Sequence, residues 1–179
     1  MSYYGGKEIA ESFRTVRNNT VTIAEEVPED KYGYSPSPDT MSVGTLLTHI
    51  ALSPGFALTI HGDKIADMKT VNFAELMQRI GVEQAKPRTK AEIIAFLKSE
   101  GEKFASFVEK LPDSFLAERV GMPPGQEPAT KSRFEMLLST KEHEMHHRGQ
   151  LMLIQRMIGL VPHLTRQRQE QRAHAASRG

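Results

Sequence analysis

Residues 131–158 read KSRFEMLLSTKEHEMHHRGQLMLIQRMI, which is the longest helical pattern in the chain. Large apolar side chains recur along it at the spacing of an α-helix that buries one face. They are Phe134, Leu137, Leu138, Met145, Leu151, Met152, Ile154 and Met157. Gly159 and Pro162 follow, in the order that usually marks a helix end. The stretch predicts one long helix over residues 131–158.

The same period appears three more times, and it predicts helices over residues 7–27, 42–62 and 89–109. Pro54 falls inside the second, where its ring clashes with the carbonyl of Ile50, so this helix should kink or stop there. A weaker pattern predicts a short helix ending at Gly81, and the Pro- and Gly-rich residues 121–129 predict a loop. No segment alternates apolar and polar residues over the length of a strand. We therefore expect an all-α four-helix bundle with short extra helices in its connections.

The chain has 179 residues, a size typical of one domain, and a formal net charge of +1. We expect a single bundle domain over residues 1–165 and a basic tail over residues 166–179. Arg166, Arg168, Arg172 and Arg178 concentrate positive charge in that tail. The rest of the chain has no basic surplus, so nucleic acid is not an expected partner.

The chain contains no cysteine, which excludes disulfides, thiolate metal sites and cysteine nucleophiles. No run approaches the ~18 apolar residues of a membrane span, and the N-terminal residues lack the pattern of a secretory signal. These features predict a soluble, cytoplasmic protein with no membrane partner.

Three of the seven histidines, His143, His146 and His147, fall within five residues of the last helix. His143 and His147 are four residues apart, on one face of a helix, and two imidazoles at this spacing can reach one divalent ion. His146 points away from that stripe. A third ligand must be His, Asp or Glu, and His49 in the second helix is the best candidate. The alternatives are solvated surface histidines and a buried His49 bonded to a carbonyl.

Residues 143–147, HEMHH, also match the letters of the metalloprotease motif HExxH. That motif belongs to enzymes with a β-sheet, which this sequence does not predict. A protease is therefore not the favoured interpretation.

Two blocks of sequence resemble the DinB/YfiT-like superfamily of metal-dependent bundle proteins. One is residues 32–50, YGYSPSPDTMSVGTLLTHI, and the other is residues 143–151, HEMHHRGQL, followed by RMIGLVP at residues 156–162. The resemblance covers residues 5–165. It implies a four-helix bundle with a metal, usually zinc or nickel, held by His49, His143 and His147. His146 matches a position that is not a ligand.

The resemblance also implies a function and an assembly. Family members with known activities transfer low-molecular-weight thiols such as bacillithiol or mycothiol, or isomerise substrates with the help of a thiol, and homodimers are common. We therefore expect a metal-dependent thiol S-transferase that acts on a small thiol and an electrophilic substrate. The alternatives are a metal-dependent hydrolase and a stress-response protein that binds metal or ligand without turnover.

An open position on a three-histidine ion would bind water or a thiol and lower its pKa. Gln150 and Glu144 are the candidate catalytic residues beside such a site. Gln150 and Arg148 could equally support the ligands or the helix packing. Gly149 is expected to allow close approach of a neighbouring helix.

Overall fold

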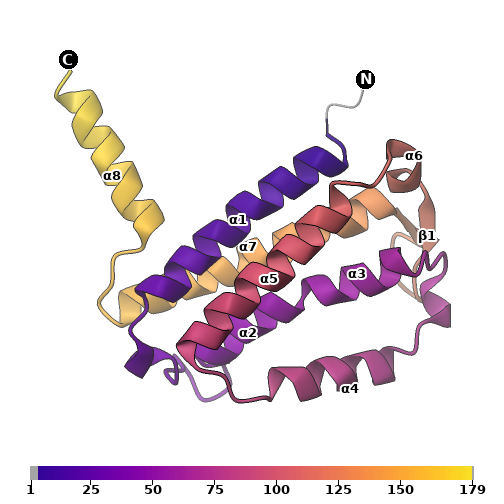
Figure 1. Cartoon of the computed structure of the whole chain (residues 1–179), viewed down its shortest axis with the longest axis horizontal. Coiled ribbons are helices and arrows are strands. Elements are labelled where there is room, and N and C mark those ends of the chain that lie inside the picture. The colour runs from indigo at the N-terminus through magenta and orange to yellow at the C-terminus, as the bar shows by residue number, and fades with distance from the viewer. Residues whose placement is uncertain (1–3, 179) are drawn as a thin grey trace.

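The computed structural model describes residues 4–178. A bundle of four helical rods forms the body of the protein (Figure 1). Its second rod is divided into two helices. The bundle consists of α1 (Gly6–Glu26), α2 (Val43–Leu52) with α3 (Pro54–Gly62), α5 (Lys90–Val108) and α7 (Arg133–Met157). This architecture confirms the predicted all-α bundle.

The apolar stripes of the rods meet in separate clusters of buried side chains along the bundle. At one end Ile9 and Phe13 of α1 pack against Phe104 of α5, and the two phenylalanine rings meet edge to face with centroids 4.7 Å apart. Towards the other end, Leu47 of α2 and Leu151 of α7 are buried together. Burying each such side chain stabilises the fold by roughly 1.5–3 kcal/mol, so the stripes explain why the rods associate.

Pro54 divides the second rod as expected. α2 ends at Leu52 and α3 begins with Pro54 at its first position. Because proline has no N–H, it cannot donate to the carbonyl of Ile50. That carbonyl instead accepts from Nη2 of Arg17 and from Oγ of Ser53, each at 3.1 Å.

The second rod is more apolar than the sequence analysis allowed. Residues Val43–Gly62 have a mean hydropathy of 1.5 and are long enough to cross a membrane. In the structure half of this stretch is buried inside the bundle. Helices of a protein core pass the same test of length and composition, so this stretch is weak evidence for a membrane span.

Short elements occupy the connections, as the sequence predicted. They are η1 (Glu29–Lys31), η2 (Met68–Thr70), α4 (Phe73–Gln84), α6 (Asp113–Leu116), β1 (Arg119–Gly121) and β2 (Thr130–Ser132). Two details differ from expectation. α4 continues one turn past Gly81, and β1 and β2 pair in an antiparallel hairpin around the predicted loop. Strands of three residues are too short to show an alternating pattern.

The basic tail is helical. α8 (His163–Ala176) begins three residues before the expected boundary at residue 166 and projects away from the bundle (Figure 1). His163 is its only buried residue among those described, and its Nε2 lies 3.1 Å from Oδ1 of Asn19 in α1. The arginines of the tail are exposed.

Candidate metal centre

His49 comes from the last turn of α2. Oγ of Ser42 caps this helix by accepting from the backbone N–H of Thr45. The break at Pro54 then ends the series of backbone hydrogen bonds of α2 about one turn after His49. The imidazole is half-buried at the rim of the core, where it faces α7.

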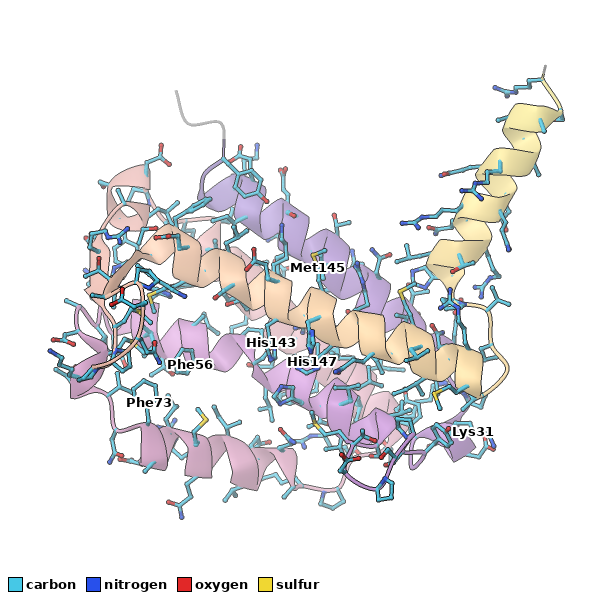
Figure 2. All side chains as sticks on the ribbon, turned by 180° about the vertical axis from the view of Figure 1, so that it is seen from behind. Lys31, Phe56, Phe73, His143, Met145 and His147 are labelled. Carbon is cyan, nitrogen blue, oxygen red and sulfur yellow. The ribbon has the colours of Figure 1, made fainter. Side chains whose placement is uncertain are left out.

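His143 and His147 lie one turn apart on α7 and point to the same side. Figure 2 shows both rings on the face of α7 that looks towards α2, whereas Met145 lies on the opposite face. His147 is buried and His143 is half-buried. The i, i+4 spacing thus places both rings opposite His49.

The Nε2 atoms of the three histidines converge. Nε2 of His143 lies 3.2 Å from Nε2 of His49 and 3.1 Å from Nε2 of His147. All three ligand atoms lie within 4.8 Å of one another. Two nitrogens bound at ~2.1 Å to one tetrahedral ion would be about 3.4 Å apart. The three histidines therefore have the spacing of ligands to a single ion.

Two glutamines orient the outer rings. Oε1 of Gln150 lies 2.8 Å from Nδ1 of His147, and Oε1 of Gln84 lies 3.2 Å from Nδ1 of His49. An amide oxygen can only accept, so both Nδ1 atoms must carry the proton. This tautomer leaves the lone pair of each Nε2 directed at the shared point, as metal-binding histidines require.

The environment keeps the α7 pair neutral. Burial lowers the pKa of His143 to about 4, and the nearby His147, His49 and His146 lower it further in the same direction. Burial also lowers the pKa of His147, against the opposite effect of the hydrogen bond that its Nδ1–H donates to Gln150. Nδ1 of His143 is itself buried without a hydrogen-bond partner among the described residues. Converging neutral imidazoles with directed lone pairs suit a divalent cation, so the residues present fit a metal ion.

The other residues named from the motif lie outside this cluster. His146 is exposed, and its Nε2 lies 3.4 Å from Nε2 of Gln150. Glu144 is fully buried on the face of α7 that packs inside the bundle, where Arg17 donates to both of its carboxylate oxygens. Glu144, which the sequence suggested as a candidate catalytic residue, is thus held in a buried ion pair with Arg17 and is not one of the three converging residues. Gly149 is exposed with no atom within 4 Å of where a Cβ would stand, so the expected close helix contact is wrong.

Arg148 is half-buried, and burial lowers its pKa while the charge of Glu144 acts in the opposite direction. It forms no ion pair within 4.0 Å in the described part of the chain.

A cavity of about 420 Å³ opens beside the histidines. His49 and His143 line one part of it, and most of the remaining wall is apolar. The apolar lining comes from α2, α3, α4 and α7 and includes Leu52, Phe56, Phe73, Met77, Ile80 and Met136. Its volume lies within the range of roughly 300–1,000 Å³ found for small-molecule sites.

Sequence reasoning missed Gln84 and Arg17. Gln84 lies beyond the point where the short helix was expected to end, so nothing local marked it. Arg17 did carry a signal, because it lies four residues after Phe13 on the buried stripe of α1. A charged residue on such a stripe predicts a buried partner, which the structure identifies as Glu144.

The chain belongs to the DinB superfamily, whose family model matches residues 12–151. It is 24% identical over 152 residues to the uncharacterized protein YjoA of Bacillus subtilis, covering 85% of this chain and 90% of that protein. The crystal structure of YjoA, a DinB-like protein, superposes with a TM-score of 0.63 at 23% identity over 85% of this chain and 92% of YjoA. A DinB-like protein from Bacillus cereus has a TM-score of 0.65 at 16% identity, covering 87% of this chain and 93% of its own. These structures share the bundle fold.

Proposed function

We propose that the protein is a metal-dependent transferase that uses a low-molecular-weight thiol, with zinc or nickel held by His49, His143 and His147. One observation carries this proposal. Three histidines direct Nε2 atoms at one point, 3.1 and 3.2 Å apart in the two closest pairs. Three protein ligands leave a position open on a tetrahedral ion, which is typical of catalytic rather than structural sites.

When bound, such an ion lowers the pKa of a thiol or water at its open position. The chain supplies the rest of the arrangement. Gln84 and Gln150 hold the rings of His49 and His147 in the tautomer that binds a cation. Because the sequence has no cysteine, the reacting sulfur must come from a separate molecule.

The apolar cavity supports a small electrophile as the second substrate. His49 and His143 belong to its wall, so a molecule held there lies directly beside the histidines. An apolar substrate that fills this lining would displace water beside the histidines, which would favour transfer to the bound substrate over hydrolysis.

A reconstituted enzyme assay tests the proposal. The full chain is loaded with zinc or nickel and mixed with a panel of small thiols and a chromogenic electrophile. We expect turnover that needs both metal and thiol, is lost in His147→Ala, and is retained in the matched variant His146→Ala. Equal rates for wild type and His147→Ala would contradict the transferase function.

The same assay separates the alternatives. Metal-dependent turnover without any thiol would establish a hydrolase. Tight metal binding without turnover for any thiol would leave a binding protein that acts in a stress response. We further propose a homodimer in the cytoplasm, and light scattering at micromolar concentration that gives the mass of one chain would contradict the dimer.

A further inference from the structure

The cavity has a second polar end, away from the metal centre. His61 lies in the last turn of α3, twelve residues after His49, which is about 18 Å along a straight helix. His61 and Lys131 both line the cavity. Figure 2 shows Phe56 and Phe73 between α3 and α4, displaced from His143 towards the end of the bundle where α3 ends. The rings of these two phenylalanines stack with centroids 6.3 Å apart.

His61 is a fixed hydrogen-bond donor at this end. The side chain is only 2% exposed, and its Nδ1 lies 3.3 Å from Nη1 of Arg133. A guanidinium can only donate, so Nδ1 accepts and the proton of the neutral ring lies on Nε2. Burial, followed by the charge of Arg133, lowers the pKa of His61 to about 4, so the ring is neutral at pH 7.

The proton on Nε2 of His61 has no acceptor within the protein. That atom makes no hydrogen bond to any of residues 4–178, although the ring forms part of the cavity wall. The atom is not among the buried side-chain atoms that lack a partner, so it is accessible from the cavity although the residue as a whole is buried. A ligand in the cavity that carries an acceptor can therefore receive this hydrogen bond.

Two cationic side chains, Arg133 and Lys131, lie at the same end. Arg133 is fully buried, and its partner Glu118 has a side chain that is 52% exposed, so solvent screens part of the compensating charge. Lys131 is half-buried and has no carboxylate within 4.0 Å among the described residues. The nearby Glu135 is instead paired with Arg119. An anion is therefore favoured over a neutral acceptor.

We propose that the cavity binds an apolar monocarboxylate, with its carboxylate between Nε2 of His61 and the ammonium of Lys131. Its apolar part extends along Phe56 and Phe73 towards His143. This inference deepens the proposed function by naming the substrate class. It rests on the proposed function in one respect, namely that the apolar end of the ligand lies beside the metal. The binding itself depends on the His61 end alone.

Calorimetry with decanoate and methyl decanoate tests the binding on the full chain, with and without zinc. We expect decanoate to bind in both states and methyl decanoate to bind about ten- to hundredfold more weakly, because the ester lacks the charge that Lys131 attracts. Equal affinity for acid and ester would overturn the inference. So would decanoate binding that requires zinc and disappears in His147→Ala, since the metal would then hold the carboxylate.

Three substitutions locate the carboxylate. His61→Phe keeps a ring but removes the donor, and Lys131→Gln removes the charge, so each should weaken decanoate about tenfold or more. His61→Gln should bind nearly as well as wild type, because its amide can accept from Arg133 and still donate to the ligand. Lys110→Gln, at a lysine outside the cavity, is the control for Lys131→Gln.

Loss of folding in His61→Phe would leave the test intact. Lys131→Gln and the ester comparison report on the same carboxylate, and unchanged affinity in both would reject the proposal. Zinc titration of wild type and His147→Ala is read separately. If the wild-type protein does not bind zinc, the proposed function is contradicted, but the decanoate result remains valid.

Discussion

Arg17 of α1 and Glu144 of α7 form an ion pair inside the bundle, with Nη2 and Oε2 2.9 Å apart. Arg17 also donates to the backbone carbonyls of Leu97 in α5 and Ile50 in α2. One guanidinium therefore connects all four rods. Ile50 directly follows His49, and Glu144 directly follows His143, so this contact fixes α2 relative to α7 just behind the metal centre.

Breaking this pair should destabilise the protein strongly. Arg17→Met or Glu144→Met leaves a buried charge without its partner, and we expect each to lower the free energy of unfolding by about 3–5 kcal/mol. The double variant should lose much less than the sum. Chemical denaturation measures all three. The exposed pair of Arg14 and Glu102 is the matched control, where Arg14→Met should cost no more than about 1 kcal/mol.

If the double variant loses as much free energy of unfolding as the two single variants together, Arg17 and Glu144 stabilise the fold independently. The ion pair would then not be the contact that holds α2 and α7 in register.

The three converging histidines should each be needed for metal binding. Replacing His49, His143 or His147 by Ala removes one ligand, and we expect zinc affinity to fall by more than about a hundredfold in competition titrations. His146→Ala is the matched control, because His146 is exposed and outside the cluster. Equal losses for His146 and His147 would mean that α7 presents a different pair of ligands.

The two glutamines should tune metal affinity without being ligands. Gln150→Leu or Gln84→Leu removes the acceptor that fixes the tautomer of His147 or His49. Loss of such a partner typically costs about 10–100-fold in metal affinity, and we expect a zinc titration to show this range. Gln78→Leu, at an exposed glutamine of α4, should leave zinc affinity unchanged. Affinities for the Gln84 and Gln150 variants equal to wild type would show that packing alone orients the rings.

Stability should depend on pH through His61. The pKa of His61 is about 4 in the folded protein, below its ordinary value of 6.5, so the unfolded chain binds the proton first as pH falls. The contribution is fully present above pH 6.5 and is lost progressively down to pH 4. Between pH 7 and pH 5 it should lower the free energy of unfolding by about 2 kcal/mol.

Urea denaturation of wild type and His61→Gln at the two pH values measures this contribution. The variant should lose about 2 kcal/mol less than wild type over the interval. His174→Gln, at an exposed histidine of α8, should follow the wild type. An identical pH dependence for wild type and His61→Gln would mean that neither the charge of Arg133 nor the burial of the His61 ring keeps His61 neutral.

The sequence by itself determined the helices and most of their ends. Helical period and capping act within a few residues, so the stripe through Leu137 and Leu151 and the break at Pro54 could be read locally. The local spacing of His143 and His147 likewise placed two rings on one face. Elements of three residues, such as β1, carry too little pattern to be recognised.

Only the tertiary structure decided which residues of other helices contact the residues that the sequence had placed on one face. Glu144 lies seven residues from both Leu137 and Leu151, so the stripe already placed it on the buried face, but not against Arg17. Gln84 reaches His49 because α4 packs beside α2, across 35 residues of sequence. Such partners are chosen by how the rods pack in three dimensions, and no periodicity along one helix encodes that choice.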